Sequence, residues 1–145
     1  LSAIVTQNID GLHQAAGSKN VFELHGSVHR NYCQKCGKFF DVNYVVNAKG
    51  VPYCDECGGI IKPDVVLYEE GLDSQTINGA VRAISKADML IIGGTSLVVY
   101  PAAGMIDYFK GKYLAVLNRD ATSRDKQADL CITDPIGEEL GRIRV

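Results

Sequence analysis

The chain has 145 residues, a formal net charge of -2 at pH 7, and 22% charged against 46% hydrophobic residues. This length and composition suit one globular domain with a sizeable core. Because the charge is near neutral and no apolar run approaches the ~20 residues of a membrane span, we expect neither a nucleic-acid nor a membrane partner.

The N-terminal part of the sequence predicts two short strands joined by a helix. The apolar segments 3–6 and 21–24 are the expected strands, and residues 10–16 between them predict a short helix that ends at Gly17. From about residue 28 to 61 the sequence has no helical period, so this stretch is expected to be an inserted module without helices.

Two Cys-x-x-Cys-Gly knuckles lie within that module. Cys33 and Cys36 form the first, Cys54 and Cys57 the second, and seventeen residues separate the two. Four thiolates at this spacing predict a closed, structural zinc site with no position left for a substrate. Disulfides are the competing interpretation. The matched knuckles and an odd fifth cysteine, Cys131, favour a reducing compartment, so we expect a cytoplasmic protein.

The C-terminal half alternates helices and apolar strands. Asp73 is placed to cap the first helix, Pro101 and Pro135 open the next two, and Cys131 is expected as a small hydrophobe on a buried strand. The expected helices cover residues 74–86, 102–110 and 135–143, and the expected strands 89–92, 113–117 and 130–132. Repeated βα units predict an α/β fold with a doubly wound parallel sheet, whose ligands bind at the carboxyl ends of its strands.

Three polar clusters follow expected strands, at residues 6–13, 24–26 and 93–96. Each has an ordinary alternative: Asn8 and Asp10 suit an Asx turn, His25 suits a satisfied core histidine, and Gly-Gly-Thr-Ser suits a plain βα turn. Where such clusters lie at one sheet edge, glycine backbone and hydroxyl groups suit phosphate or ribose oxygens.

Taken in order around the four-Cys insert, these motifs closely resemble the sirtuin family over essentially the whole chain. The matching segments are Thr-Gln-Asn-Ile-Asp at 6–10, Leu-His-Gly at 24–26, the two knuckles, Lys-Pro-Asp-Val-Val at 62–66, Gly-Thr-Ser-Leu at 94–97 and Leu-Asn-Arg at 117–119.

The resemblance implies a partial Rossmann-like fold and an NAD-dependent protein-lysine deacylase, most simply a deacetylase, that releases nicotinamide and 2′-O-acyl-ADP-ribose from NAD and an acyl-lysine protein or peptide. His25 matches the general base on the ribose hydroxyls, and Val65 and Val66 match the edge that pairs with the substrate peptide. The positions that match NAD contacts are Gln7, Asn8, Asp10, Gly94, Thr95, Ser96, Asn118, Pro135 and Ile136.

Two further histidines are expected to have lesser roles. His13 matches a recurring family position and is expected to be structural. His29 lies near Cys33 in the sequence, but four thiolates already fill the metal, so we expect it to support the site indirectly or to face solvent. The family pattern also divides the chain into Rossmann-like parts at 1–27 and 62–145 and a zinc module at 28–61.

The sequence departs from the family pattern in two respects. Residues Tyr68, Glu69 and Glu70 stand where many relatives have Phe-Gly-Glu, beside the peptide edge. In addition, the Gly-rich strand–turn–helix and the Pro-Asp-Phe-Arg type loop that hold NAD in the family are absent, so we expect a C-terminal portion that is inactive alone and prone to self-association through an open sheet edge.

Two alternatives remain open at this point. One is a sirtuin-type protein ADP-ribosyltransferase, which would not need a base on the ribose hydroxyls, so His25 favours deacylation. The other is a zinc-ribbon binding module without enzymatic activity. Few basic residues surround the knuckles, which counts against nucleic acid as its partner.

Overall fold

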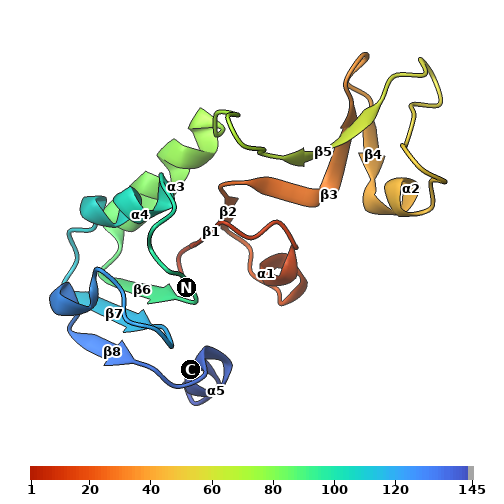
Figure 1. Ribbon diagram of the computed structural model, residues 1–145. Helices are drawn as coiled ribbons and strands as arrows, with labels where there is room; N and C mark the ends of the chain where they lie inside the picture. Colours follow the sequence, from red (N-terminus) through yellow and green to blue (C-terminus); the bar gives the residue numbers. More distant parts are fainter. Residues whose placement is uncertain (144–145) are drawn as a thin grey trace. The chain divides into compact units, whose positions relative to one another are not determined.

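A computed structural model of the protein describes residues 1–143, and it divides into two compact units (Figure 1). The first unit comprises Leu1–Ile77 and the second begins at Asn78. Among the described residues, no helix is long and apolar enough to cross a membrane.

A pair of parallel strands opens the first unit, as the sequence predicted. Strand β1 (Ile4–Thr6) pairs with β2 (Val21–Glu23), and helix α1 (Leu12–Ala15) lies in the connection between them. The register sets Thr6 opposite Glu23, and the Leu24 N–H donates to the Thr6 carbonyl oxygen at 2.9 Å. Because the two strands are parallel, the segments that follow β1 and β2 both begin at the same edge of this sheet.

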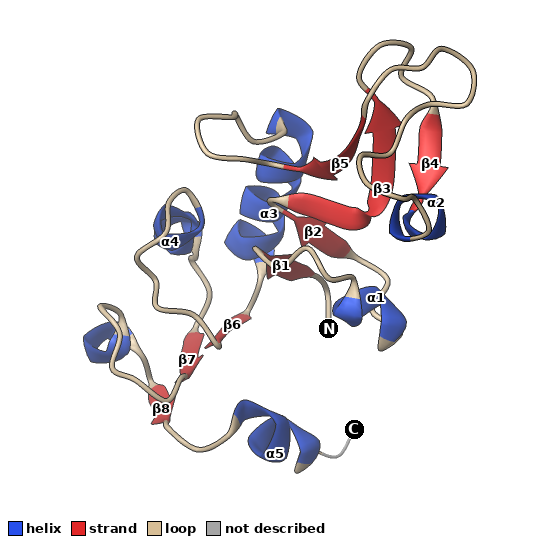
Figure 2. Cartoon of the chain, turned by 45° about the vertical axis from the view of Figure 1, so that its right-hand side comes forward, coloured by secondary structure: helices blue, strands red, loops and turns tan. Residues whose placement is uncertain are grey.

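The second part of this unit is a three-stranded antiparallel sheet in the order β4-β3-β5 (Figure 2). Its strands are β3 (Gly26–Cys33), β4 (Phe39–Asp41) and β5 (Ile61–Val65). The β3–β5 register shifts between Ser27 and Asn31, and Asn31 lies opposite Pro63. Proline has no N–H for a sheet ladder, so an irregular register is the expected result.

The inserted module does contain a helix, contrary to the sequence-based expectation. Helix α2 (Val42–Val46) follows β4 and is a single turn. The Asp41 carboxylate caps it by accepting the N–H of Tyr44 at 2.9 Å. One turn is too short to produce a visible 3.6-residue pattern, which is why periodicity did not reveal it.

The second unit is built on a three-stranded parallel sheet in the order β6-β7-β8. Its strands, β6 (Met89–Gly93), β7 (Tyr113–Leu117) and β8 (Leu130–Ile132), confirm the three apolar runs. Helix α3 (Ser74–Lys86) begins in the first unit and leads into β6, with Ala80 and Ile84 buried on its predicted apolar stripe. Asp73 caps it, because its Oδ2 accepts the N–H of Thr76 at 2.7 Å.

The remaining helices are shorter than predicted. The expected helix at 102–110 is an α-helical turn, α4 (Ala102–Met105), followed by a 3-10 turn (Ile106–Tyr108). The last helix, α5 (Ile136–Gly141), covers part of the expected range, and a further 3-10 turn (Asp125–Gln127) precedes β8.

Burial in the second unit is less complete than the apolar runs suggested. Ile92, Leu114 and Val116 form its core cluster, but Met89 and Ile91 of β6 are 49% and 43% exposed. Cys131, expected to be buried, is exposed. It lies on β8, which among the described strands pairs with β7 alone, so the prediction of a buried cysteine was wrong.

Candidate functional site

The four knuckle cysteines gather at one point. Their sulfur atoms all lie within 4.8 Å of one another, with Cys33 and Cys57 at 3.4 Å and Cys36 and Cys54 at 3.7 Å. Tetrahedral zinc with Zn–S bonds of about 2.3 Å requires sulfurs about 3.8 Å apart. The cluster therefore fits a structural zinc ion, as predicted, and these cysteines would hold it with no open position for a reactant.

The two knuckles have the same backbone design. Gly37 and Gly58 have φ of 75° and 69°, and their N–H groups donate to the carbonyl oxygens of Cys33 and Cys54, each at 2.9 Å. The left-handed conformation closes each turn and is the one that favours glycine. Lys38 joins the knuckles, since its Nζ lies 2.8 Å from carboxylate oxygens of both Asp55 and Glu56.

The thiols of the cluster do not ionise equally. The backbone N–H of Cys36 donates to the Cys33 sulfur and lowers the pKa of that thiol to about 6. At Cys36, the Lys38 N–H lowers the pKa, but the neighbouring Cys57 sulfur and burial outweigh it and raise the pKa to about 12. Metal binding must therefore displace protons, which makes it dependent on pH.

His25 is held at the carboxyl edge of the β1–β2 pair. Its Nδ1 lies 3.1 Å from the carbonyl oxygen of Gln7, and the residue is half-buried. A carbonyl can only accept, so this contact favours the tautomer with the proton on Nδ1. That tautomer leaves Nε2 with a free lone pair, which is the arrangement a general base requires.

The segment after β1 combines a local turn with one unsatisfied donor. Asp10 Oδ1 accepts the Leu12 N–H at 3.0 Å, so the Asx-turn alternative is realised at Asp10. Asn8 is exposed, and its N–H donates to Thr6 Oγ1 at 3.1 Å. Within residues 1–143, the buried Nε2 of Gln7 has no hydrogen-bond partner. A buried amide donor of this kind is costly unless a ligand oxygen accepts from it.

The predicted peptide edge is joined directly to the histidine. The Val66 N–H donates to the His25 carbonyl oxygen at 3.1 Å, and Val65 lies opposite Gly26 in the β3–β5 ladder. Gly26 has φ of 76°, and a Cβ there would lie 1.8 Å from the carbonyl oxygen of Asp64. Only glycine permits this close approach, so the Leu-His-Gly motif sets the distance between the histidine and the peptide edge.

The turn after β5 contains the segment that departs from the family pattern. Glu69 adopts φ of 72°, a left-handed conformation, at the position where many relatives have glycine. The adjacent Glu70 carboxylate accepts the Leu67 N–H at 2.9 Å and lies 3.2 Å from the Lys62 Nζ. Lys62 Nζ also donates to the Val65 carbonyl oxygen at 2.9 Å. The turn thus keeps its shape through these side chains even though its glycine is missing.

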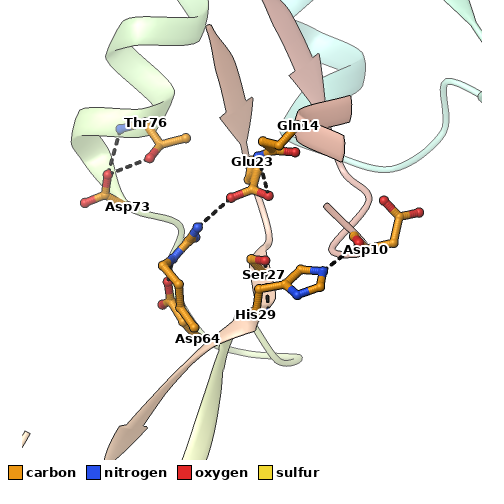
Figure 3. Close-up of polar contacts among 9 residues, drawn as sticks. Asp10, Gln14, Glu23, Ser27, His29, Asp64, Asp73 and Thr76 are labelled. Carbon is orange, nitrogen blue, oxygen red and sulfur yellow. Dashed lines mark hydrogen bonds and ion pairs between the residues drawn. The ribbon is translucent and has the colours of Figure 1, made fainter. Parts of the chain in front are cut away.

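A cleft of about 430 Å³ lies between α1 and the strands β2 and β3. One of the side chains that line it is Glu23, which is only 8% exposed and whose carboxylate accepts from Gln14 Nε2 at 2.8 Å (Figure 3). His29 closes one side, with Nε2 2.9 Å from the Asp10 carbonyl oxygen. The cleft is lined by Asp10, Gly11, Leu12, Gln14, Ala15, Glu23, Ser27, His29 and Arg30.

Arg30 completes this arrangement and was missed by the sequence reasoning. Its Nη1 lies 2.7 Å from Glu23 Oε2, and its Nε lies 2.8 Å from Asp64 Oδ2. Burial lowers the pKa of the guanidinium, but these two carboxylates outweigh it and raise that pKa above its ordinary value. A glutamate within a short apolar strand was the available signal, because a charge there requires a partner.

The second unit gathers its own predicted residues at the carboxyl ends of its strands. Gly94 has φ of 62° and donates its N–H to the Leu117 carbonyl oxygen at 3.2 Å. Asn118 follows β7, and its N–H donates to the Ile132 carbonyl oxygen at 3.0 Å. A Cβ on Gly93 would lie 2.3 Å from Cδ1 of Ile136, so the α5 side chain covers the end of β6.

Within this loop, the Thr95 hydroxyl accepts the Leu97 N–H at 3.2 Å, and Ser96 is exposed. Pro135 immediately precedes α5 and accepts the Glu138 N–H at 3.0 Å. Glycine backbone, hydroxyl and amide groups, and an apolar side chain meet at this edge. This set suits a ligand with phosphate, ribose and aromatic parts.

Comparison with known proteins identifies the family. A sequence profile of the Sir2 family matches residues 1–101. The chain belongs to the Sir2 family. Two NAD-dependent protein deacetylases, from Clostridium acetobutylicum and Clostridium perfringens, are 67% and 66% identical to it over 97% and 99% of its length. The sirtuin chain spans only 58% and 59% of those relatives.

Solved sirtuin structures agree with this assignment. A Sir2 with p53 peptide and NAD+ is 39% identical and superposes with a TM-score of 0.88, over 98% of this chain and 61% of that one. Another, determined in a study of sirtuin substrate affinity, gives a TM-score of 0.91 over 98% of this chain and 60% of that one. The predicted sirtuin fold with its zinc module is confirmed.

The predicted site residues of this sirtuin fall into two groups. The first unit brings together Gln7, His25, Val65 and Val66, because the His25 ring contacts the Gln7 carbonyl and the His25 carbonyl accepts from Val66, with Asn8 and Asp10 in the same loop as Gln7. The second unit brings together the Gly94–Ser96 loop, Asn118 and Ile136. Their roles toward NAD and peptide remain predictions.

Proposed function

We propose that the whole protein is an NAD-dependent protein-lysine deacetylase, with NAD as a consumed co-substrate. The observation that carries this proposal is the placement of His25, whose ring contacts the Gln7 carbonyl while its own carbonyl accepts from Val66. A candidate base is thereby fixed to both the NAD-facing loop and the peptide edge. The names of its relatives, NAD-dependent protein deacetylases, support the same conclusion.

In this proposal an acyl-lysine peptide adds an extended strand along Val65 and Val66, so that main-chain hydrogen bonds supply affinity. The bond between ribose C1′ and nicotinamide breaks with its electron pair on nicotinamide, and the acyl oxygen bonds to C1′. Nε2 of His25 then takes a proton from a ribose hydroxyl, so that the 2′-oxygen can bond to the acyl carbon. The bond between the acyl carbon and the lysine nitrogen then breaks to release the protonated lysine, and water adds to the acyl carbon while its bond to the oxygen on C1′ breaks, which leaves 2′-O-acyl-ADP-ribose.

The other predicted contacts act by binding and orientation. The unsatisfied Gln7 Nε2 suits a ribose oxygen, and Asn8 and Asp10 suit the carboxamide of nicotinamide. In the second unit, Gly94 and its neighbouring hydroxyls suit phosphate and adenosine ribose, and Ile136 suits the adenine. Zinc supplies no chemistry to this reaction, because its four thiolates leave no open position.

The test uses the whole protein with NAD and an acetyl-lysine peptide. We expect equal amounts of nicotinamide, deacetylated peptide and O-acetyl-ADP-ribose. Transfer of ADP-ribose to protein without deacetylated peptide would favour the ADP-ribosyltransferase alternative. Absence of any NAD consumption would favour a zinc module that only binds. Both outcomes would contradict the proposal.

The role of His25 is tested by two substitutions. His25→Ala should lower deacetylation by about 10²–10⁴-fold, the usual contribution of a positioned base. Nicotinamide exchange should survive better, because the base acts after nicotinamide leaves. His25→Asn is the matched control, since its amide still donates to the Gln7 carbonyl but cannot take a proton. Near-normal turnover in His25→Asn would show that His25 only orients the loop.

We also propose that the protein resides in the cytoplasm, because its five cysteines are free in the structure and four of them suit a metal. Fractionation of cells followed by detection of the protein tests this assignment.

A further inference from the structure

The ion-pair network around Arg30 links the segments that carry the proposed chemistry. Glu23 lies two residues before His25, and Asp64 lies directly before Val65. Arg30 joins them with one guanidinium, at 2.7 Å and 2.8 Å. The second Glu23 oxygen accepts from Gln14 Nε2, which lies on α1 after the Asn8–Asp10 loop. One network therefore touches three functional segments.

The two ends of this network have different environments. The Glu23 side chain is 8% exposed, whereas the Asp64 side chain is 45% exposed. A buried carboxylate with both oxygens paired has a fixed position, because breaking one pair leaves an uncompensated buried charge. Glu23 is therefore the anchor, and Arg30 transmits its position to the more exposed Asp64.

The backbone alone does not fix this relation. Between Ser27 and Asn31 the β3–β5 register shifts, and the ladder opposite that shift contains Pro63, which donates no N–H. Arg30 lies within this irregular stretch of β3, and its side chain pairs with Asp64 on β5. A side-chain contact therefore replaces the missing ladder bonds at the point where β5 turns into the peptide edge.

We infer that Arg30 is a positioning residue that sets the peptide edge at Val65 and Val66 relative to His25, through Asp64 on one side and Glu23 on the other. This inference rests on the proposed deacetylase function and adds a residue to it. Arg30 touches no substrate in this scheme. It acts by holding the acyl-lysine in register with the base, and misplacement of reacting groups by about 1 Å can cost about 10²-fold in rate.

The experiment measures steady-state kinetics of the whole protein with acetyl-lysine peptide and NAD varied separately. Arg30→Met should raise the peptide KM and lower kcat, so that kcat/KM for the peptide falls by roughly 10- to 100-fold, while KM for NAD stays near the wild-type value. Asp64→Asn should reproduce the rise in peptide KM with kcat little changed. Glu23→Gln should reproduce the fall in kcat. Arg30→Lys keeps the charge but cannot place two nitrogen donors in the fixed plane of a guanidinium. Its kcat/KM for the peptide should therefore lie between those of wild type and Arg30→Met.

Arg124→Met is the matched control. Arg124 Nη2 pairs with Asp107 at 2.7 Å in the second unit, so its loss removes one Arg–Asp pair without touching the network. It should leave peptide KM and kcat unchanged. Wild-type turnover is established first, so failure of the proposed function appears as an inactive wild type and not as a normal Arg30 variant.

Two results would overturn the inference. One is an Arg30→Met protein with wild-type kinetic constants. The other is a variant whose activity falls only in proportion to its folded fraction, with peptide KM unchanged, since that is a purely structural role. If Arg30→Met fails to fold, the peptide KM of Asp64→Asn becomes the deciding measurement. An unchanged peptide KM in that variant overturns the inference.

Discussion

The zinc module (residues 28–61) and the parallel-sheet unit that begins at Asn78 each owe their internal order to different forces. The buried cluster of the zinc module consists of Cys33, Phe40, Cys54 and Ile61, and two of these four are metal ligands. The buried cluster of the second unit is purely aliphatic, with further apolar side chains packed against it. We therefore expect the zinc module to depend on a metal for its order, whereas the second unit depends on apolar packing.

The same contrast applies to how each region positions functional residues. In the second unit, parallel strands bring loops to one edge, the general arrangement of α/β folds. In the first, the position of His25 depends on specific contacts: the Gln7 carbonyl, the close approach at Gly26, and the pairs made by Arg30. The first unit is accordingly the more sensitive to single substitutions at its site.

Removal of zinc is expected to have the largest effect and to separate the two regions. Structural zinc sites in small peptides contribute about 10 kcal/mol or more of apparent binding free energy at neutral pH. Purified protein should contain about one zinc per chain, and chelation should abolish amide-exchange protection in β3, β4 and β5 while β6, β7 and β8 keep theirs.

Hydrogen exchange by mass spectrometry makes this measurement, with metal analysis on the same samples. Loss of protection in both regions would show that they are not independent in stability. A disulfide among Cys33, Cys36, Cys54 and Cys57 in carefully reduced protein would contradict the zinc assignment altogether.

A substitution at the Gly26 close approach should have the next largest effect. Gly26→Ala places a Cβ 1.8 Å from the Asp64 carbonyl oxygen at φ of 76°. Left-handed backbone costs about 1–2 kcal/mol for alanine and overpacking about 1–3 kcal/mol more, so unfolding free energy should fall by about 3 kcal/mol. Urea denaturation measures it.

Gly17→Ala is the control in the same unit. Gly17 has φ of 91° with no atom within 4 Å of a built Cβ, so alanine there bears only the conformational cost. Equal losses in the two variants would mean that the β3–β5 contact relaxes freely, and that Gly26 does not set the distance between His25 and the peptide edge.

The smallest effect concerns pH and the helix that leads from one unit into the other. The N–H of Thr76 donates to the Asp73 carboxylate and lowers the pKa of Asp73. A carboxylate with a lowered folded-state pKa stabilises the protein above its unfolded pKa of about 3.9, and this contribution disappears as the pH falls through the folded-state value.

Melting temperatures of three proteins across pH test this assignment. Asp73→Asn keeps an amide oxygen for capping but does not titrate, so it should match wild type near neutral pH and show a weaker decline in acid. Asp73→Ala loses the cap and should be less stable at every pH. If the melting temperature of Asp73→Asn declined in acid as steeply as that of wild type, other carboxylates would be responsible for the decline.

The sequence by itself determined the features that depend on neighbouring residues. Cysteine spacing predicted the metal cluster, apolar runs predicted the strands of the parallel sheet, and Asp73 marked the start of α3. The motif order around the insert indicated the sirtuin family, and with it His25. All of these signals are read within a few residues of the chain, where spacing and propensity act.

Only the tertiary structure revealed the rest, because it depends on residues far apart in the sequence. Arg30 meets Asp64 from 34 positions away, and no local pattern shows that pairing. The left-handed turn at Glu69 is maintained by Lys62 and Glu70. Cys131 is exposed because β8 lies at the edge of its sheet in the described structure. An apolar run in the sequence predicts a strand, but it does not show whether other strands or helices pack on both sides of that strand.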